Sequence, residues 1–161
     1  MQGHPLDHIG IAVSDLADAE QLWRRLGFHL TPRSQHFGAR TPGAAVEPFG
    51  SSNHCAMLRT GYVEIVGLSD PSLFSRVPPM LEKYEGIHIV AFGCANADAT
   101  HGRLREAKIA APAPVALQRS VPFGVEGTGT RQVAFRNINV DTNAFPEARF
   151  ILIEHLTREV M

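Results

Sequence analysis

The feature that most constrains the fold is a strand-and-helix pattern that occurs twice along the chain. Residues 6–13 alternate apolar with small or polar side chains, a period of two that predicts a strand. Ser14 follows as a suitable N-cap, and the apolar side chains of residues 16–26 recur at helical spacing. The same succession returns as an apolar strand at 87–94 and a helical pattern at 97–107. An internal duplication explains this repeat most simply.

Each half continues with further short strands. In the first half, the apolar runs 54–59 and 62–67 flank Thr60-Gly61, which predicts a hairpin after one short strand near Thr31. The second half contains three further runs of this kind, at 115–120, 131–137 and 150–156. Strands joined mostly by hairpins form largely antiparallel sheets with helices on one side, so we expect an α+β fold.

The sequence therefore predicts two βαβββ modules, the first at about 5–68 and the second at about 87–157, with a linker at 69–86. Two alignments of the modules are open. A shift of 80 residues matches His8 with His88, whereas a shift of 81 matches it with Ile89. The shift of 81 also aligns the apolar positions of strand and helix, which must be buried together. We therefore expect Ile89 at the position of His8, with His88 facing away.

Composition narrows the class of protein. The chain has 161 residues, which fits one domain over 1–161, and its 15 basic and 16 acidic residues give a net charge of −1. That balance argues against a nucleic-acid or membrane-surface partner, and no apolar stretch is long enough to span a bilayer. The two cysteines, Cys55 and Cys94, predict a reducing compartment, and the N-terminus lacks a signal-peptide pattern, so we expect a cytoplasmic protein. The chain also lacks G-x-S-x-G, dinucleotide-binding and C-x-x-C motifs.

Three segments carry a family resemblance: LDHIGIAV near the N-terminus, YVEIVG before the midpoint and FILIEH near the end. In this order they resemble the vicinal oxygen chelate superfamily, which includes glyoxalase I, methylmalonyl-CoA epimerase, extradiol dioxygenases and bleomycin resistance proteins. The opening resembles the epimerase, whereas SSNHCAML and FILIEHLT resemble uncharacterised glyoxalase-like members. The resemblance implies that the two modules form curved mixed sheets around a metal or ligand cavity, and it implies a homodimer.

The resemblance also implies a set of metal ligands. By position, His8, Glu64 and Glu154 match ligands of the family, whereas the fourth ligand position falls on Ile89. One imidazole and two carboxylates suit a divalent ion such as zinc, nickel, manganese, cobalt or iron. Without a cation, two neighbouring carboxylates would repel each other.

His54, His88 or water remains open as the fourth ligand. The face of His54 depends on the hairpin loop: a two-residue loop places it opposite to Glu64, and a three-residue loop places both on one face. His155 alternates with Glu154 and is expected on the other side of its strand, and His36 is assigned to the surface or a loop.

The implied chemistry is that of a metal-dependent lyase or isomerase. The ion would stabilise an enolate-type intermediate of a small substrate with vicinal oxygens, such as a hemithioacetal, a 2-oxoacid derivative or an acyl thioester. Glu154 or Glu64 would move the proton, and Arg131 and Arg136 are candidates for binding an anionic substrate. Two alternatives stay open: a metal-free protein that binds or sequesters a small molecule, and an extradiol-type dioxygenase with iron and His54.

Overall fold

The computed structural model describes residues 4–40, 44–123, 129–141, 143 and 145–157, without the side chains of 119–123 and 130. The chain divides into two compact units. The first unit is Leu6–Val90, and the second is Ala91–Met161 together with Met1–Pro5. None of the helices in the described ranges is long and apolar enough to cross a membrane.

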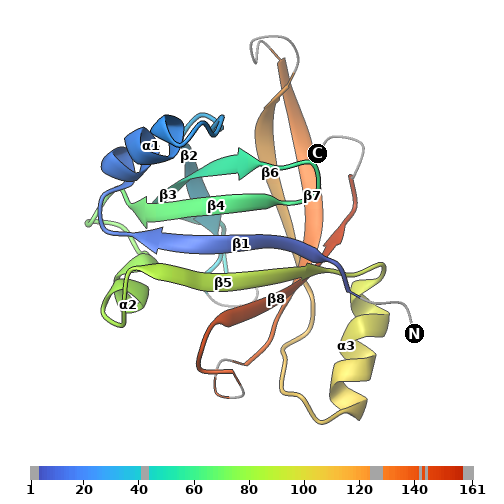
Figure 1. Cartoon of the computed structure of the whole chain (residues 1–161). Coiled ribbons are helices and arrows are strands. Elements are labelled where there is room, and N and C mark those ends of the chain that lie inside the picture. The colour runs from blue at the N-terminus through green and yellow to red at the C-terminus, as the bar shows by residue number, and fades with distance from the viewer. Residues whose placement is uncertain (1–3, 41–43, 124–128, 142, 144, 158–161) are drawn as a thin grey trace. The chain divides into compact units, whose positions relative to one another are not determined.

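The first unit contains one βαβββ module. Its elements are β1 (Leu6–Val13), α1 (Leu16–Arg25), β2 (Ser34–Gly38), β3 (Glu47–Met57) and β4 (Tyr62–Leu68). The strands lie in the order β2-β3-β4-β1, with β1 parallel to β4 and the other pairs antiparallel (Figure 1). Asp15, not Ser14, caps α1, because its carboxylate accepts the backbone N–H groups of Ala17 and Asp18.

β3 is longer than expected, and the hairpin loop differs. The strand begins at Glu47 instead of residue 54, and Met57 pairs with Tyr62, so that the loop has the four residues 58–61 instead of two. The early part of β3, EPFGSS, contains Gly, Pro and Ser in place of β-branched residues, and this composition concealed the strand. Gly61 takes φ +75 in this loop, where a Cβ would lie 2.2 Å from the Asp7 carbonyl oxygen.

Both faces of the first sheet are packed at least in part. Under α1, a cluster of buried apolar residues forms the main core: Val13, Leu16, Leu30, Ala56 and Ile65. On the other face, Val77 of α2 (Val77–Leu81) packs against Ala12 and Val66. The expected linker is therefore a packed part of the first unit.

The second module follows the same order. β5 (Gly86–Gly93) begins in the first unit, and the second unit contains α3 (Ala97–Glu106), β6 (Val115–Phe123), β7 (Gly129–Asn139) and β8 (Arg149–His155). The last three strands lie in the order β8-β7-β6 and are antiparallel. α3 packs over an apolar cluster around Cys94, Ala97 and Ile138. The predicted α+β fold of two βαβββ modules is confirmed.

Candidate functional site

A group of polar side chains lies on the face of the first sheet that is turned away from α1. In the β1–β4 register, His8 pairs with Tyr62 and Gly10 pairs with Glu64. Successive side chains of a strand point to opposite faces, and Ile65 packs under α1, so Glu64 and Tyr62 point away from the helix. This group, called the open-face cluster below, consists of His8, Tyr62 and Glu64 together with Asn53 of β3 and His36 of β2.

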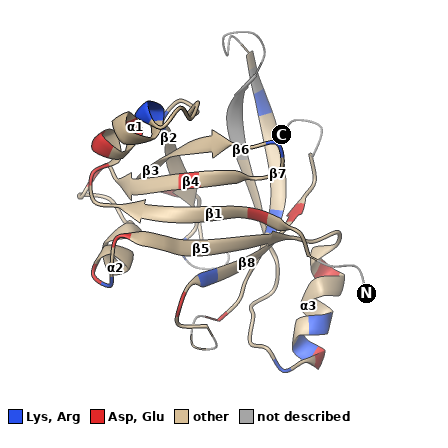
Figure 2. Ribbon diagram, viewed as in Figure 1, with Lys and Arg blue, Asp and Glu red and all other residues tan. Residues whose placement is uncertain are grey.

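Glu64 is the acidic centre of the open-face cluster and the only charged residue of β4 (Figure 2). Its side chain is 13% exposed, its Oε1 lies 3.3 Å from His36 Nε2, and the Asn53 amide donates to the same oxygen at 2.5 Å. Burial alone would raise the pKa of this carboxyl, but the hydrogen bond and charge of His36, the charge of His8 and the Asn53 hydrogen bond lower it to about 2. Glu64 is therefore ionised at neutral pH.

His8 is held in one orientation by two neighbours. Its ring is buried and stacks on Tyr62 with 4.3 Å between the ring centroids, and its Nδ1 lies 2.8 Å from Asp7 Oδ1. A carboxylate only accepts hydrogen bonds, so the proton of a neutral His8 ring sits on Nδ1 and the lone pair on Nε2. This is the arrangement by which a carboxylate orients a metal-ligating or proton-accepting imidazole.

His36 is a member of the open-face cluster that the sequence analysis assigned to the surface or a loop. Its Nδ1 lies 3.0 Å from Ser51 Oγ, and its side chain is 28% exposed. The short strand β2 lies within a Gly- and Pro-rich stretch, where no periodic pattern extends far enough to identify a face. Only the pairing of β2 with β3 brings this imidazole to Glu64.

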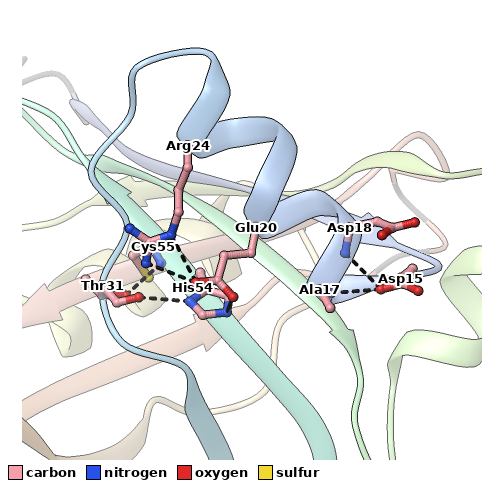
Figure 3. Close-up of polar contacts among 8 residues, drawn as sticks. All are labelled: Asp15, Ala17, Asp18, Glu20, Arg24, Thr31, His54 and Cys55. Carbon is pink, nitrogen blue, oxygen red and sulfur yellow. Dashed lines mark hydrogen bonds and ion pairs between the residues drawn. The ribbon is translucent and has the colours of Figure 1, made fainter.

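His54 lies on the helix side of the sheet, away from Glu64. It pairs with Ile65 and is 3% exposed. Because the loop has an even number of residues, four instead of the expected two, His54 keeps the face that the two-residue loop would give it. Figure 3 shows its two ring nitrogens engaged beneath α1: Nδ1 with the Thr31 carbonyl at 2.8 Å, and Nε2 with Glu20 Oε2 at 3.4 Å. Of the two faces left open by the sequence, the structure places His54 on the one opposite to Glu64.

Glu154 likewise lies on the helix side of its own sheet. Its Oε2 accepts the Ala97 N–H at the start of α3 at 2.9 Å and lies 3.7 Å from Arg136 Nη1. It shares a face of β8 with Leu152, which packs against the cluster under α3. This position suits a carboxylate that stabilises a helix N-terminus, and it differs from the open-face position that the resemblance implied.

The two arginines expected to bind substrate are placed differently. Arg136 forms two hydrogen bonds of 2.7 Å with Asp98 of α3, and this guanidinium lowers the pKa of the Asp98 carboxyl. Arg131 is exposed on β7. Arg136 is therefore engaged in fixing α3 to β7.

The strand registers explain why Glu154 does not correspond to Glu64. In the first module Gly67 lies against Leu16, because a Cβ built on Gly67 would be 2.9 Å from the Leu16 Cβ. In the second module Glu154 accepts the N–H of Ala97, the residue that corresponds to Leu16 when the modules are aligned with a shift of 81. Glu154 therefore takes the place of Gly67 in the second module. Three residues earlier along each strand, Ile151 takes the place of Glu64.

Ile89 takes the place of His8, as the shift of 81 predicts. A Cβ built on Gly10 would lie 2.8 Å from the Ile89 Cβ, so the Ile89 side chain lies on the same face as Gly10 and His8. His88 alternates with it, stacks on Tyr84 at 4.1 Å and has its Nε2 2.8 Å from the Tyr84 carbonyl oxygen. An imidazole therefore does not stand at this position of the second module.

The fit of these residues to a divalent ion is partial. His8 and Glu64 share the open face and offer the imidazole and ionised carboxylate that such an ion prefers. Within the described ranges, however, no group of three or more His, Cys, Asp or Glu side chains stands in position to hold a metal. Of the four candidate ligands in the first and second modules, His8 and Glu64 lie on the open face of the first sheet, His54 lies under α1, and Glu154 lies beside α3.

Comparison with known proteins gives the family. The model of the glyoxalase-like domain matches residues 6–160. A hypothetical protein from Bacillus halodurans shares 18% identity over 95% of each chain, with a TM-score of 0.64. A methylmalonyl-CoA epimerase, solved in complex with methylmalonyl-CoA and NH4+, shares 20% identity over 96% of each chain, with a TM-score of 0.62.

The epimerase of Mycobacterium tuberculosis shares 21% identity over 93% of this chain and 87% of that chain, with a TM-score of 0.58. No curated protein matches the sequence. Likenesses at this level of identity show a common fold. The family match covers nearly the whole sequence, and the chain therefore belongs to the glyoxalase-like domain family.

Proposed function

We propose that this protein is a metal-dependent enzyme of the isomerase or lyase type, which moves a proton at the carbon beside a carbonyl group. The proposed substrate is a small molecule with adjacent oxygens, with an acyl thioester as the first candidate because two similar structures contain methylmalonyl-CoA or a nitronate analogue of a CoA thioester. The observation that supports this proposal is the buried, ionised carboxylate of Glu64 among the imidazoles of the open-face cluster.

In this proposal Glu64 binds a cation and does not transfer the proton. A general base works best when its pKa is near the operating pH, and a carboxyl with a pKa of about 2 is a weak base at neutral pH. Glu64 and the Nε2 of His8 would instead hold a divalent ion, and the hydrogen bond from His8 Nδ1 to Asp7 would fix the ring. When bound, such an ion supplies Lewis-acid stabilisation of a developing oxyanion.

We assign the proton transfer to His36. Its ring is partly exposed and lies 3.3 Å from Glu64, so a substrate can reach it and the carboxylate can stabilise the positive charge that it acquires. One ring nitrogen takes the proton from the carbon beside the carbonyl, which leaves the electron pair on the substrate as an enolate. The same ring then returns the proton to carbon and restores the carbonyl form, and that centre is inverted when the enolate has first turned its opposite face toward the ring.

Proton exchange into deuterated solvent tests this assignment, with a panel of acyl thioesters and 2-oxoacids followed by NMR. We expect His36→Gln to slow exchange by about 100-fold or more while the bound metal is retained. His8→Ala and Glu64→Gln should lose the metal, about one equivalent in the wild-type protein. His29→Gln, a matched change at an exposed histidine, should leave both quantities unchanged. Exchange at the wild-type rate in the His36→Gln variant would remove His36 from the mechanism.

The second candidate function is a metal-free protein that binds a small molecule. It is favoured by the second module, where Ile89 and Ile151 stand in place of His8 and Glu64. A protein that purifies without metal, and whose ligand affinity is unchanged by His8→Ala and Glu64→Gln, would support this function.

Iron with oxygen uptake on a catechol would instead indicate the dioxygenase. Its two imidazoles would be His8 and His36, because His54 lies under α1.

A further inference from the structure

A second cluster in the first unit combines arginine side chains with aromatic rings just before α2. Phe49 of β3 and Phe74 pack edge to face with ring centroids 5.2 Å apart. The guanidinium carbon of Arg76 lies 5.1 Å from the Phe49 centroid and 5.4 Å from the Phe74 centroid. Arg40 approaches the Phe74 ring as well, at 5.0 Å. The two rings thus fix the position of a cationic side chain.

The two arginines of this cluster differ in their partners. Arg40 forms an ion pair with Glu47. Arg76, by contrast, has no hydrogen bond or ion pair with any residue that the structure describes, although its side chain is partly buried and burial lowers its pKa. The carboxylate of Asp70, six residues earlier in the chain, accepts the N–H and hydroxyl of Ser72. Among the residues that the structure describes, this partly desolvated guanidinium therefore has no counter-ion.

The ring contacts do not satisfy this guanidinium. The two rings attract the positive charge but offer no oxygen acceptor to the five N–H donors of the guanidinium. Removing a charge from water is costly unless the charge is paired, and a planar guanidinium pairs best with two oxygens of one anion. We propose that the cluster of Arg76, Phe49 and Phe74 is a binding site for the oxyanion group of a small molecule, a carboxylate or a phosphate.

This site is distant from His8 and Tyr62 but adjoins the β2–β3 side of the open-face cluster, because His36 Nδ1 lies 3.0 Å from the Oγ of Ser51, two residues after Phe49. The backbone N–H of Gly50 donates to the Phe74 carbonyl, and the Gly50 carbonyl accepts the N–H of Ser69, so the site adjoins the start of β3 and the end of β4. His8 and Tyr62 lie at the other end of β4. Six residues of strand separate Tyr62 from Leu68, or roughly 20 Å at ~3.3 Å per residue. The anion titration described next does not measure enzymatic activity, so this proposal and the proposed function can fail separately.

Anion titration of the whole protein tests the site. Thermal unfolding is followed with increasing phosphate or succinate at constant ionic strength, with sodium chloride as the screening control. We expect one of the two anions to raise the melting temperature of the wild-type protein and to shift the Arg76 Nε–H resonance in an NMR spectrum. A response to phosphate only or to succinate only identifies the ligand class.

Two variants and one control decide whether Arg76 causes the effect. Arg76→Gln should bind the anion about tenfold more weakly or worse, and without anion it should melt at or above the wild-type temperature because an unpaired charge is gone. Arg76→Lys keeps the charge without the planar fork and should also bind more weakly. Arg59→Gln, the same change at an exposed arginine, should behave as wild type.

The opposite results would overturn the site. If Arg76→Gln keeps the anion-dependent shift, the anion binds elsewhere. If the anion-free variant melts below wild type and chloride reproduces the wild-type response, Arg76 serves the packing of Phe49 and Phe74 alone. The NMR titration of the wild-type protein gives a result even if a variant fails to fold.

Discussion

The two modules share one order of strands and helices but place their acidic residues on opposite faces. In the first module, Glu64 lies on the face turned away from α1, among imidazoles. In the second module, Glu154 lies on the face covered by α3 and bonds to the helix N-terminus. Gly67 and Ile151 occupy the corresponding positions. Sequence motifs of similar appearance, YVEIVG and FILIEH, therefore carry different roles, because the cross-strand register decides the face.

The largest effect is expected when a glutamate is placed in the second module at Ile151, the position that corresponds to Glu64. Ile151 is 5% exposed and has no imidazole in the place of His8, where Ile89 stands. Ile151→Glu should therefore bury an unpaired carboxylate and lower the free energy of unfolding by roughly 3 kcal/mol, measured in urea. Leu156→Glu, at a residue that is 52% exposed, is the control and should change stability little. A stable Ile151→Glu protein would mean that this face is wet or already cationic.

The second prediction concerns how the stability of the wild-type and Glu64→Gln proteins depends on pH in the acid range. The pKa of this carboxyl falls from 4.5 to about 2 on folding, so the unfolded chain takes up the proton first as the pH drops. The stabilisation is fully present above pH 4.5 and is lost between 4.5 and about 2, by roughly 3 kcal/mol at most. Stability curves of wild type and Glu64→Gln should therefore converge across this window. Parallel curves would show that Glu64 is not selectively stabilised in the folded state.

A substitution of Glu154 tests its role at the start of α3. Glu154→Ala removes the acceptor at the start of α3 and one neighbour of Arg136, and should lower the free energy of unfolding by about 1 kcal/mol. Metal content and proton exchange should stay at wild-type values. Glu106→Ala, at the other end of α3, is the stability control. Loss of metal from the Glu154→Ala protein would restore Glu154 as a ligand.

The smallest expected effect concerns the ends of the two helices. Phe28 N–H donates to the Trp23 carbonyl and Ile109 N–H to the Leu104 carbonyl, so both helices end in the same motif. The left-handed residue is Gly27 with φ 93 in the first module and Lys108 with φ 58 in the second.

A side chain is strained in that conformation, so Lys108→Gly should raise the free energy of unfolding by about 1 kcal/mol or less. Gly27→Ala should lower the free energy of unfolding by a similar amount. Calorimetry on both variants measures the difference. A loss of stability in the Lys108→Gly protein would show that the lysine side chain makes a compensating contact.

Much of the fold could be predicted from local pattern. The period of two at residues 6–13 and 87–94, each followed by a helical stretch, gave the two modules, and the alignment of apolar positions gave Ile89 opposite His8. β3 was incompletely predicted, since its first residues are Gly, Pro and Ser in place of typical strand formers. Strand formation there depends on pairing with β2 and β4, which a local window does not contain.

The candidate site was predictable only in part. His8 and Glu64 follow from the motif and from alternation along two strands, whereas His36 belongs to a strand too short to show a period. The polarity of β3 gave no clue either, because Asn53 and His54 are both buried but point to opposite faces. Adjacent residues of a strand always separate in this way, so a polar run by itself does not identify a site.

The sequence alone determined the duplicated architecture and the relation of residues within each strand, because both depend on short-range periodicity. Only the tertiary structure decided which face each strand turns to a helix and which residues of neighbouring strands meet. These arrangements depend on contacts between distant segments. The pairing of β2 with β3 places His36 near Glu64, and the packing of β8 under α3 places Glu154 near Ala97. A shift of one residue in either pairing would exchange the two faces, so the chemistry of this protein depends on long-range register.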